Sequence, residues 1–198
     1  MFTKVKNKIL WQATTRDYKI GDIIEFGKER NYQAHRVYNT NYKMPGAECD
    51  MAEMFVDKKL KEKKKLALKE MKSISRILWD YGFSMRELGM EICRQKFYCD
   101  RPSRLTGMYL CDEKEKAKGY LSTAQCKGKT TDPKVVGVKL NGKLLKTSNH
   151  FNMRGGKSID EFIEQAHDYW KGVNKDFNED SVEYLFEGTA EVVEIIRY

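Results

Sequence analysis

Residues 109–120 read Tyr-Leu-Cys-Asp-Glu-Lys-Glu-Lys-Ala-Lys-Gly-Tyr, and the spacing of the two tyrosines is the most informative feature of the sequence. Tyr109 would end a strand, and Asp112 with Glu115 has the form of a capping box that starts a helix. Tyr120 would lie on that helix, so the two phenol rings could face each other across a slot for one flat heterocycle. Alternatively, both rings only fill a core, as aromatic side chains commonly do. The spacing by itself leaves both interpretations open.

Length and composition favour a single domain. The chain has 198 residues, 40% of them hydrophobic, enough for one well-buried core and too few for two. No apolar run is long enough to cross a bilayer, and the first residues lack the apolar core of a signal peptide. The five cysteines form no Cys-x-x-Cys pair, so we expect free thiols and no metal site. These features predict a cytoplasmic protein that binds no membrane.

The charge balance raises the possibility of an acidic partner. There are 37 Lys and Arg residues against 29 Asp and Glu residues, which gives a net charge of +8. Such a balance is consistent with RNA or DNA as a partner, or with solubility alone. The densest basic run, Lys58 to Lys72, is typical of a solvated helix face.

Strand patterns occur near both ends of the chain. Asn141-Gly142 between two apolar stretches predicts a hairpin, and Glu187-Gly188-Thr189 predicts a second connection between strands. Residues 28–50 contain few apolar anchors and predict a surface loop. The expected strands cover residues 9–14, 105–110, 134–140, 143–145, 182–186 and 190–196.

Helix patterns lie between these strands. Apolar residues at positions 67, 71, 74, 78 and 81 predict a helix ended by Gly82, and a Ser84–Glu87 capping box predicts a second helix that ends near Phe97. A third helix would begin at the Ser158–Glu161 capping box and end at Gly172. Its inner side would carry Ile159, Phe162, Ile163, Ala166 and Trp170, and the helix before Phe97 would carry surface or interhelical ion pairs among Arg86, Glu87, Glu91 and Arg94.

This order of elements predicts an α+β fold without the Gly-rich loop of a doubly wound nucleotide-binding fold. We expect residues 1–198 to form one domain, with a helical insertion at about 55–100.

Three segments resemble the motifs of one superfamily. The Tyr109 and Tyr120 pair is similar to the signature by which diphtheria-toxin-like and poly-ADP-ribose-polymerase-like ADP-ribosyltransferases hold the nicotinamide ring of NAD. Trp11-Gln12-Ala13-Thr14 is similar to their first motif, aromatic-His-Gly-Thr. Residues 182–188 resemble their last motif, a strand that begins with the catalytic glutamate. A narrower resemblance covers residues 85–110 and points to an uncharacterised bacterial family often grouped with these transferases.

The resemblance implies a split β-sheet core with flanking helices and transfer of ADP-ribose from NAD, the substrate, to a macromolecule. It implies that Glu183 is the catalytic residue, with Glu187 as the alternative. Cleavage of the bond between nicotinamide and ribose develops positive charge on the sugar, which a carboxylate can stabilise. Tyr109 and Tyr120 would hold the nicotinamide ring.

The first motif departs from the family pattern. Gln12 stands where the family has histidine, and its amide can replace a hydrogen bond to a ribose hydroxyl because it both donates and accepts. Ala13 stands in place of glycine, so its φ must be negative for its backbone to contact the carboxamide of nicotinamide. Thr14 matches the motif. The only histidines that could supply the missing side chain from elsewhere are His35, His150 and His167.

An arginine suits the pyrophosphate of NAD because its fork of donors binds two oxygens. Arg104 is the expected ligand and Arg101 the alternative. Ser181 stands where arginine-modifying relatives carry a second acidic or amide residue, so arginine is a less expected acceptor. The positive charge favours nucleic acid slightly over protein as the acceptor.

Two further functions stay open. One is a catalytically silent protein that binds NAD or ADP-ribose, because the family histidine is missing. The other is a basic nucleic-acid-binding module without NAD chemistry, in which exposed aromatic side chains stack on bases. A toxin role with an inhibitory partner protein would be consistent with the first class of function.

Overall fold

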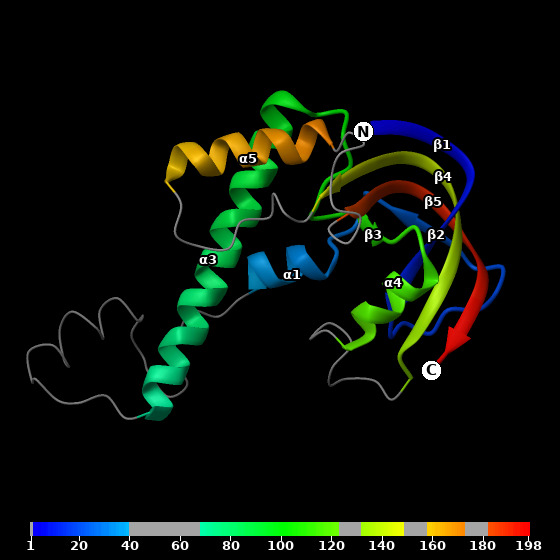
Figure 1. Cartoon of the computed structure of the whole chain (residues 1–198), viewed down its shortest axis with the longest axis horizontal. Helices are drawn as coiled ribbons and strands as arrows, with labels where there is room; N and C mark the ends of the chain where they lie inside the picture. Colours follow the sequence, from blue (N-terminus) through cyan, green and yellow to red (C-terminus); the bar gives the residue numbers. More distant parts are fainter. Residues whose placement is uncertain (1, 40–67, 123–131, 149–157, 173–181) are drawn as a thin grey trace, which may run out of the picture.

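The computed structural model describes residues 2–39, 68–122, 132–148, 158–172 and 182–198. The chain combines helices with an antiparallel sheet, so the α+β class is confirmed (Figure 1). Among the described residues, no helix is both long and apolar enough to cross a membrane. The elements are β1 Phe2–Thr14, β2 Ile23–Phe26, α1 Tyr32–Asn39, α3 Leu68–Phe97, β3 Met108–Leu110, α4 Lys114–Gly119, a 3-10 turn Tyr120–Ser122, β4 Lys134–Ser148, α5 Ile159–Lys171 and β5 Val182–Arg197.

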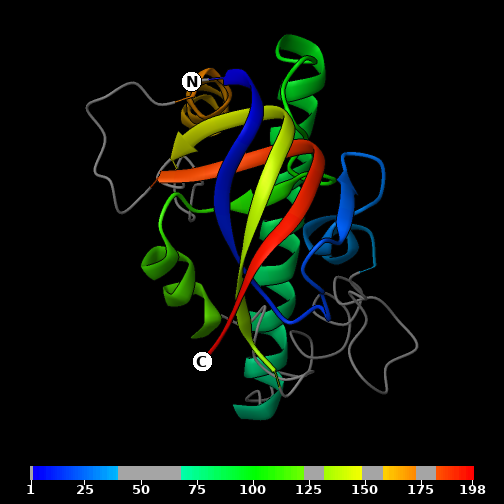
Figure 2. The same ribbon diagram turned by 90° about the vertical axis from the view of Figure 1, so that its right-hand side faces the viewer.

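The sheet has the order β1-β4-β5-β2, and β3 pairs with the first part of β5. Three long curved strands, β1, β4 and β5, run side by side (Figure 2). Trp11 and Cys111 then bridge β1 to the residue after β3, with Trp11 N donating to Cys111 O at 2.9 Å and Cys111 N donating to Trp11 O at 2.8 Å. This bridge closes β1, β4, β5 and β3 into a small ring.

A hydrophobic core fills this ring. Alternation along each strand sends every second side chain inward, where apolar residues from all four strands meet. The enclosed core consists of Leu10, Met108, Leu110, Val136, Val138, Leu140, Leu144, Tyr184, Phe186, Ala190 and Val192.

A second core lies between the outer face of the sheet and the two longest helices. α5 crosses the C-terminal half of α3, and both cover the same end of β4 and β5 (Figure 1). Trp170 Nε1 donates to Met90 O at 2.9 Å, which fixes one helix against the other. The buried members of this helix-covered core are Met90, Leu145, Ala166, Tyr169, Trp170 and Leu185.

The hairpin predicted at Asn141-Gly142 is wrong, because β4 is one continuous strand. Gly142 lies opposite Gly188 of β5, and a Cβ atom at Gly142 would lie 2.2 Å from the carbonyl oxygen of Glu187. Gly188 has φ 140°, and β5 also runs through the connection expected at residues 187–189. The glycines therefore allow two strands to approach closely at this point and do not form a turn.

Of the three predicted capping boxes, only that of Ser158 and Glu161 is confirmed, together with the end of α5 at Gly172. α3 continues through Gly82, and Ser84 Oγ donates to the carbonyl of Asp80 one turn earlier. α4 has Glu113 as its N-cap without a side-chain cap, while Asp112 accepts a hydrogen bond from Lys116.

Two further expectations need correction. The predicted loop at residues 28–50 contains helix α1, which packs on α3, while residues 40–50 lie outside the described chain. The apolar stripe expected on α3 is not buried where it is described, because Leu78 and Tyr81 are exposed. On α5, Ala166 and Trp170 face inward as predicted, but Ile159 and Ile163 are exposed.

Candidate functional site

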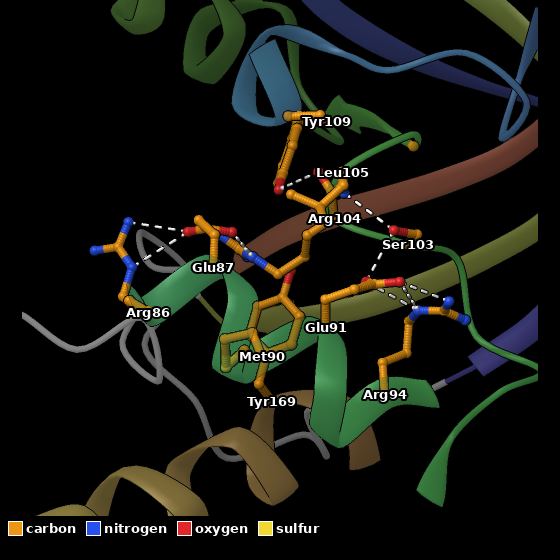
Figure 3. A network of polar contacts seen from close by, with 12 residues as sticks. Arg86, Glu87, Met90, Glu91, Arg94, Ser103, Arg104, Leu105, Tyr109 and Tyr169 are labelled. Carbon is orange, nitrogen blue, oxygen red and sulfur yellow. Dashed lines mark hydrogen bonds and ion pairs between the residues drawn. The ribbon is translucent and has the colours of Figure 1, made fainter. Parts of the chain in front are cut away.

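A buried guanidinium, that of Arg104, lies at the centre of a polar network between α3, α5 and the sheet (Figure 3). Its Nε and Nη2 donate to the two carboxylate oxygens of Glu87, at 2.8 and 3.1 Å. Its Nη1 donates to Oε1 of Glu183 at 2.9 Å. The Arg104 side chain is 1% exposed, so one buried cation joins a carboxylate of α3 to a carboxylate of β5.

Strand alternation places Glu183 in this network. Glu183 is the second residue of β5, and it lies on the same side of that strand as Leu185, under α3 and α5. Tyr169 of α5 donates its hydroxyl to Glu183 Oε1 at 2.5 Å. Thr147, opposite Glu183 on β4, donates its hydroxyl to the carbonyl of Tyr169 at 2.7 Å and fixes this turn of α5.

The network keeps its charges ionised despite burial. Burial alone would raise the pKa of Glu87, but the attraction of Arg104 and Arg86 outweighs it, and the net pKa of this carboxyl is below its ordinary value. Burial acts to lower the pKa of Arg104, yet Glu87, Tyr109, Tyr169 and Glu183 together raise it well above the ordinary value. Arg104 therefore stays a cation.

The neighbouring tyrosines stay neutral donors. Burial raises the pKa of Tyr109 and of Tyr169 well above that of a free phenol, and the nearby positive charge of Arg104 only partly opposes it. The Tyr169 hydroxyl therefore stays protonated and can donate a hydrogen bond to Glu183 over the whole pH range in which proteins are commonly folded.

The two oxygens of Glu183 differ. Oε1 accepts from both Arg104 and Tyr169, whereas no group of the described chain donates to Oε2. The Glu183 side chain is 15% exposed, while that of Glu87 is fully buried. Glu183 can therefore still accept a hydrogen bond from a ligand, and its negative charge can stabilise positive charge that develops nearby.

A second ion pair supports the segment that carries Arg104. Glu91 accepts from Arg94 Nη2 at 2.7 Å, which confirms an expected pair along α3, and from Ser103 Oγ at 2.9 Å. The same Ser103 oxygen accepts from the backbone N–H of Leu105 at 3.1 Å. α3 thus holds the Arg104 side chain through Glu87 and the preceding residue, Ser103, through Glu91 (Figure 3).

Tyr109 lies near Arg104 and on the same face of the sheet as Glu183. Tyr109 pairs with Leu185 in the sheet and donates its hydroxyl to the carbonyl of Arg104 at 3.1 Å. The Arg104 guanidinium carbon lies 5.4 Å from the centre of the Tyr109 ring. Tyr120 follows α4, which packs on β1 and β4, and it is 41% exposed. No contact described for Tyr109 joins it to Tyr120, so the expected slot between the rings stays a prediction.

The first-motif residues lie on β1, where Gln12 faces the enclosed core, whereas Glu183 lies on the outer face of the sheet under α3 and α5. Gln12 is opposite Val136 and shares its side of β1 with Leu10, toward the enclosed core. Its Oε1 atom is buried and has no hydrogen-bond partner. Ala13 has negative φ, as its expected role requires, and Thr14 Oγ1 accepts from the N–H of Arg16 at 3.1 Å.

The pyrophosphate contact expected of Arg104 needs correction. Its side chain is buried and its Nε, Nη1 and Nη2 atoms all donate to protein carboxylates, so the guanidinium has no free face for a phosphate. Arg101, the alternative, lies with its guanidinium 4.2 Å from the Phe2 ring centre and pairs with Asp100 at 3.1 Å.

The remaining candidates have other surroundings. Glu187 pairs with Lys143 at 3.3 Å. The Tyr98 hydroxyl and His167 Nδ1 lie 3.1 Å apart between α3 and α5, and His35 lies on α1. His150 lies outside the described residues, as does the basic run from Lys58 up to residue 67.

The cysteines described by the structure, Cys93, Cys99 and Cys111, are free thiols, and Cys49 and Cys126 fall outside it. No cluster of three or more His, Cys, Asp or Glu side chains that could hold a metal ion is found in the described ranges.

Sequence reasoning missed Glu87 as a member of this site. The sequence predicts that Glu87 forms an ion pair with a residue of its own helix, and its Oε1 does lie 3.0 Å from Nη2 of Arg86. Its bond to Arg104, seventeen residues later, has no regular spacing. The signal available was the spacing of Phe83 and Met90, four residues before and three residues after Glu87, which places all three on one buried face of α3.

A family model described as "Protein of unknown function (DUF2441)" matches residues 10–198 of the chain. No curated protein matches.

Proposed function

The chain belongs to the DUF2441 family, and we propose that it is an NAD-dependent ADP-ribosyltransferase built on a split-sheet core, with Glu183 as its catalytic carboxylate. The proposal rests on the resemblance of three short motifs to those of ADP-ribosyltransferases. One structural observation supports it above the others: segments far apart in the sequence become neighbours in one small ring of strands.

The neighbours are the three motif segments themselves. Trp11, in the first motif, bridges to Cys111, two residues after Tyr109. Leu110 in turn lies opposite Tyr184, the residue after Glu183. Tyr109 and Glu183 also lie on the same face of this ring, and Arg104 contacts both residues.

The chemistry of the proposed reaction suits Glu183. The bond between the ribose carbon and the nicotinamide nitrogen breaks, its electron pair leaves with nicotinamide, and positive charge develops on the ribose. A nucleophilic atom of the acceptor then bonds to that carbon and releases a proton to solvent. Glu183 would stabilise the positive charge and accept a hydrogen bond from a ribose hydroxyl. The exposed ring of Tyr120 would cover one side of the nicotinamide.

We propose a macromolecular acceptor, with nucleic acid favoured over protein. The net charge of +8 supports this choice, because a basic protein attracts polyanions over a distance. We also propose that the protein is cytoplasmic and that an inhibitory partner protein restrains it.

A catalytically silent NAD-binding protein is the second candidate. Gln12 in place of the family histidine favours it, and so does the ion pair that already engages Glu183 with Arg104. Such a protein would bind NAD without breaking it.

Incubation of the purified chain with labelled NAD and a cell lysate distinguishes these functions. Label that becomes nuclease-sensitive supports transfer to nucleic acid, and protease-sensitive label supports transfer to protein. A rise in melting temperature with NAD, without label transfer, supports the silent binder. If NAD causes neither label transfer nor a rise in melting temperature, a nucleic-acid-binding module without NAD chemistry is the remaining candidate, and the proposal is overturned.

A further inference from the structure

We infer that Arg104 and Tyr169 are positioning residues that hold Glu183 by one carboxylate oxygen, Oε1, and present the other, Oε2, to the substrate. The inference rests on the proposed function and deepens it. It names residues that need not touch the substrate, and it replaces the role of pyrophosphate ligand expected of Arg104.

The direction of the two donors carries the inference. A free carboxylate has two equivalent oxygens and can rotate about its last bond. Here the Arg104 Nη1 and Tyr169 hydroxyl donors come from different segments and converge on Oε1, at 2.9 and 2.5 Å. Hydrogen bonds to a charged acceptor are among the strong ones, and two of them fix the rotation of the group. Oε2 is then the oxygen that a ribose hydroxyl can reach.

The donors are themselves immobilised. The fully buried Glu87 accepts a bidentate pair of hydrogen bonds from Nε and Nη2 of Arg104. Thr147 holds the backbone of Tyr169 at 2.7 Å. A first set of contacts supported by a second is what fixes a reacting group within fractions of an ångström.

The chain offers a matched pair of substitutions. Tyr169→Phe removes only the hydroxyl that reaches Glu183. Tyr98→Phe also removes one tyrosine hydroxyl between α3 and α5, but this hydroxyl lies beside His167, at 3.1 Å. Both variants lose one polar contact of the same interface, so any effect confined to Tyr169→Phe is due to Glu183 and not to the packing of α5.

The first measurement is the rate of NAD consumption. We expect Tyr169→Phe to lower kcat about tenfold or more and to change KM for NAD less than twofold, because orientation matters in the transition state and not in binding. Tyr98→Phe should change neither. Equal kcat in Tyr169→Phe and wild type, or the same loss in both variants, would overturn the inference.

The second measurement is independent of NAD. A double-mutant cycle of Tyr169→Phe with Glu183→Ala, read as the equilibrium constant for urea unfolding, should show that the two changes are coupled by about fivefold or more. The cycle of Tyr98→Phe with Glu183→Ala should show none. Should Glu183→Ala not fold, Glu183→Gln takes its place in both cycles. Additive effects in the first cycle would overturn the positioning role. If coupling is found but neither wild type nor any variant consumes NAD, the proposed function fails while the positioning of Glu183 stands.

Discussion

Arg104 Nη1 and Glu183 Oε1 lie 2.9 Å apart although the two residues are separated by 79 positions in the chain. The contact joins the segment before β3 to the start of β5, and Glu87 completes it from α3. A buried ion pair of this kind costs desolvation, which its Coulombic attraction offsets only when the geometry and the further hydrogen bonds are good. The network of Arg104 meets that condition through three donor atoms and two carboxylates.

Removal of the Glu87 charge should therefore destabilise the protein strongly. We expect Glu87→Gln to lower the free energy of unfolding by about 3 to 5 kcal/mol, because it leaves the buried guanidinium of Arg104 with only Glu183. Urea unfolding measures this. Asp168→Asn is the control, because Asp168 forms an exposed pair with Lys171 at 3.2 Å, and its loss should cost about 0.5 kcal/mol or less. Similar small losses in both variants would contradict the buried network.

The same carboxyl predicts an acid dependence of stability. The pKa of Glu87 in the folded protein is below its ordinary value, which is about 4.3 in an unfolded chain. Its contribution is therefore present above the unfolded pKa and is lost as the pH falls through the folded pKa. Urea midpoints measured from about pH 5 down to about pH 3 should fall more steeply in wild type than in Glu87→Gln. Parallel curves would show that Glu87 is not held as an ion.

The close approach of β4 and β5 predicts a strict need for glycine at position 142. Gly142→Ala should lower the free energy of unfolding by about 1 to 3 kcal/mol or more, because its Cβ would lie 2.2 Å from a backbone oxygen of β5. Gly82→Ala on α3 is the matched control, since a Cβ there meets nothing within 4 Å and alanine favours a helix by about 1 kcal/mol. If position 142 is instead the tip of a hairpin, Gly142→Ala will cost little.

Substitution of Tyr120 tests whether its ring covers the nicotinamide of NAD. Its side chain is exposed, so Tyr120→Ala should change stability little. If its ring covers nicotinamide, the dissociation constant for NAD should rise about tenfold, as measured by calorimetry. Tyr198→Ala is a suitable control because Tyr198 is also exposed and aromatic. An unchanged dissociation constant in Tyr120→Ala would remove Tyr120 from the site.

Local signals in the sequence predicted local structure well where nothing distant competed. Ser158 and Glu161 form their capping box because both partners lie within one helical turn. Ser84 and Glu87 have the same spacing, yet α3 continues through them: Ser84 Oγ donates to the carbonyl of Asp80, and Glu87 binds Arg104. A four-residue pattern carries no information about a partner seventeen residues away.

The site was predicted in part for the same reason. The resemblance implied roles for Tyr109 and Glu183, the chemistry of a pyrophosphate ligand suggested Arg104, and the fold brings these three residues together. Arginine suits a phosphate, but the packing of α3 and β5 around Arg104 makes protein carboxylates its partners. Burial is a property of the assembled chain, and for an arginine the sequence gives little sign of it.

The catalytic role of Glu183 is tested by supplying labelled NAD to the purified wild-type chain and to Glu183→Gln, with a lysate as the source of acceptor. Glu191→Gln is the control, because Glu191 also lies on β5 but forms an ion pair with Lys139 outside this network. We predict transfer by wild type and by Glu191→Gln, and a loss of about a hundredfold or more in Glu183→Gln with its fold retained. Equal transfer by Glu183→Gln and wild type would contradict the assignment of Glu183 as the catalytic carboxylate.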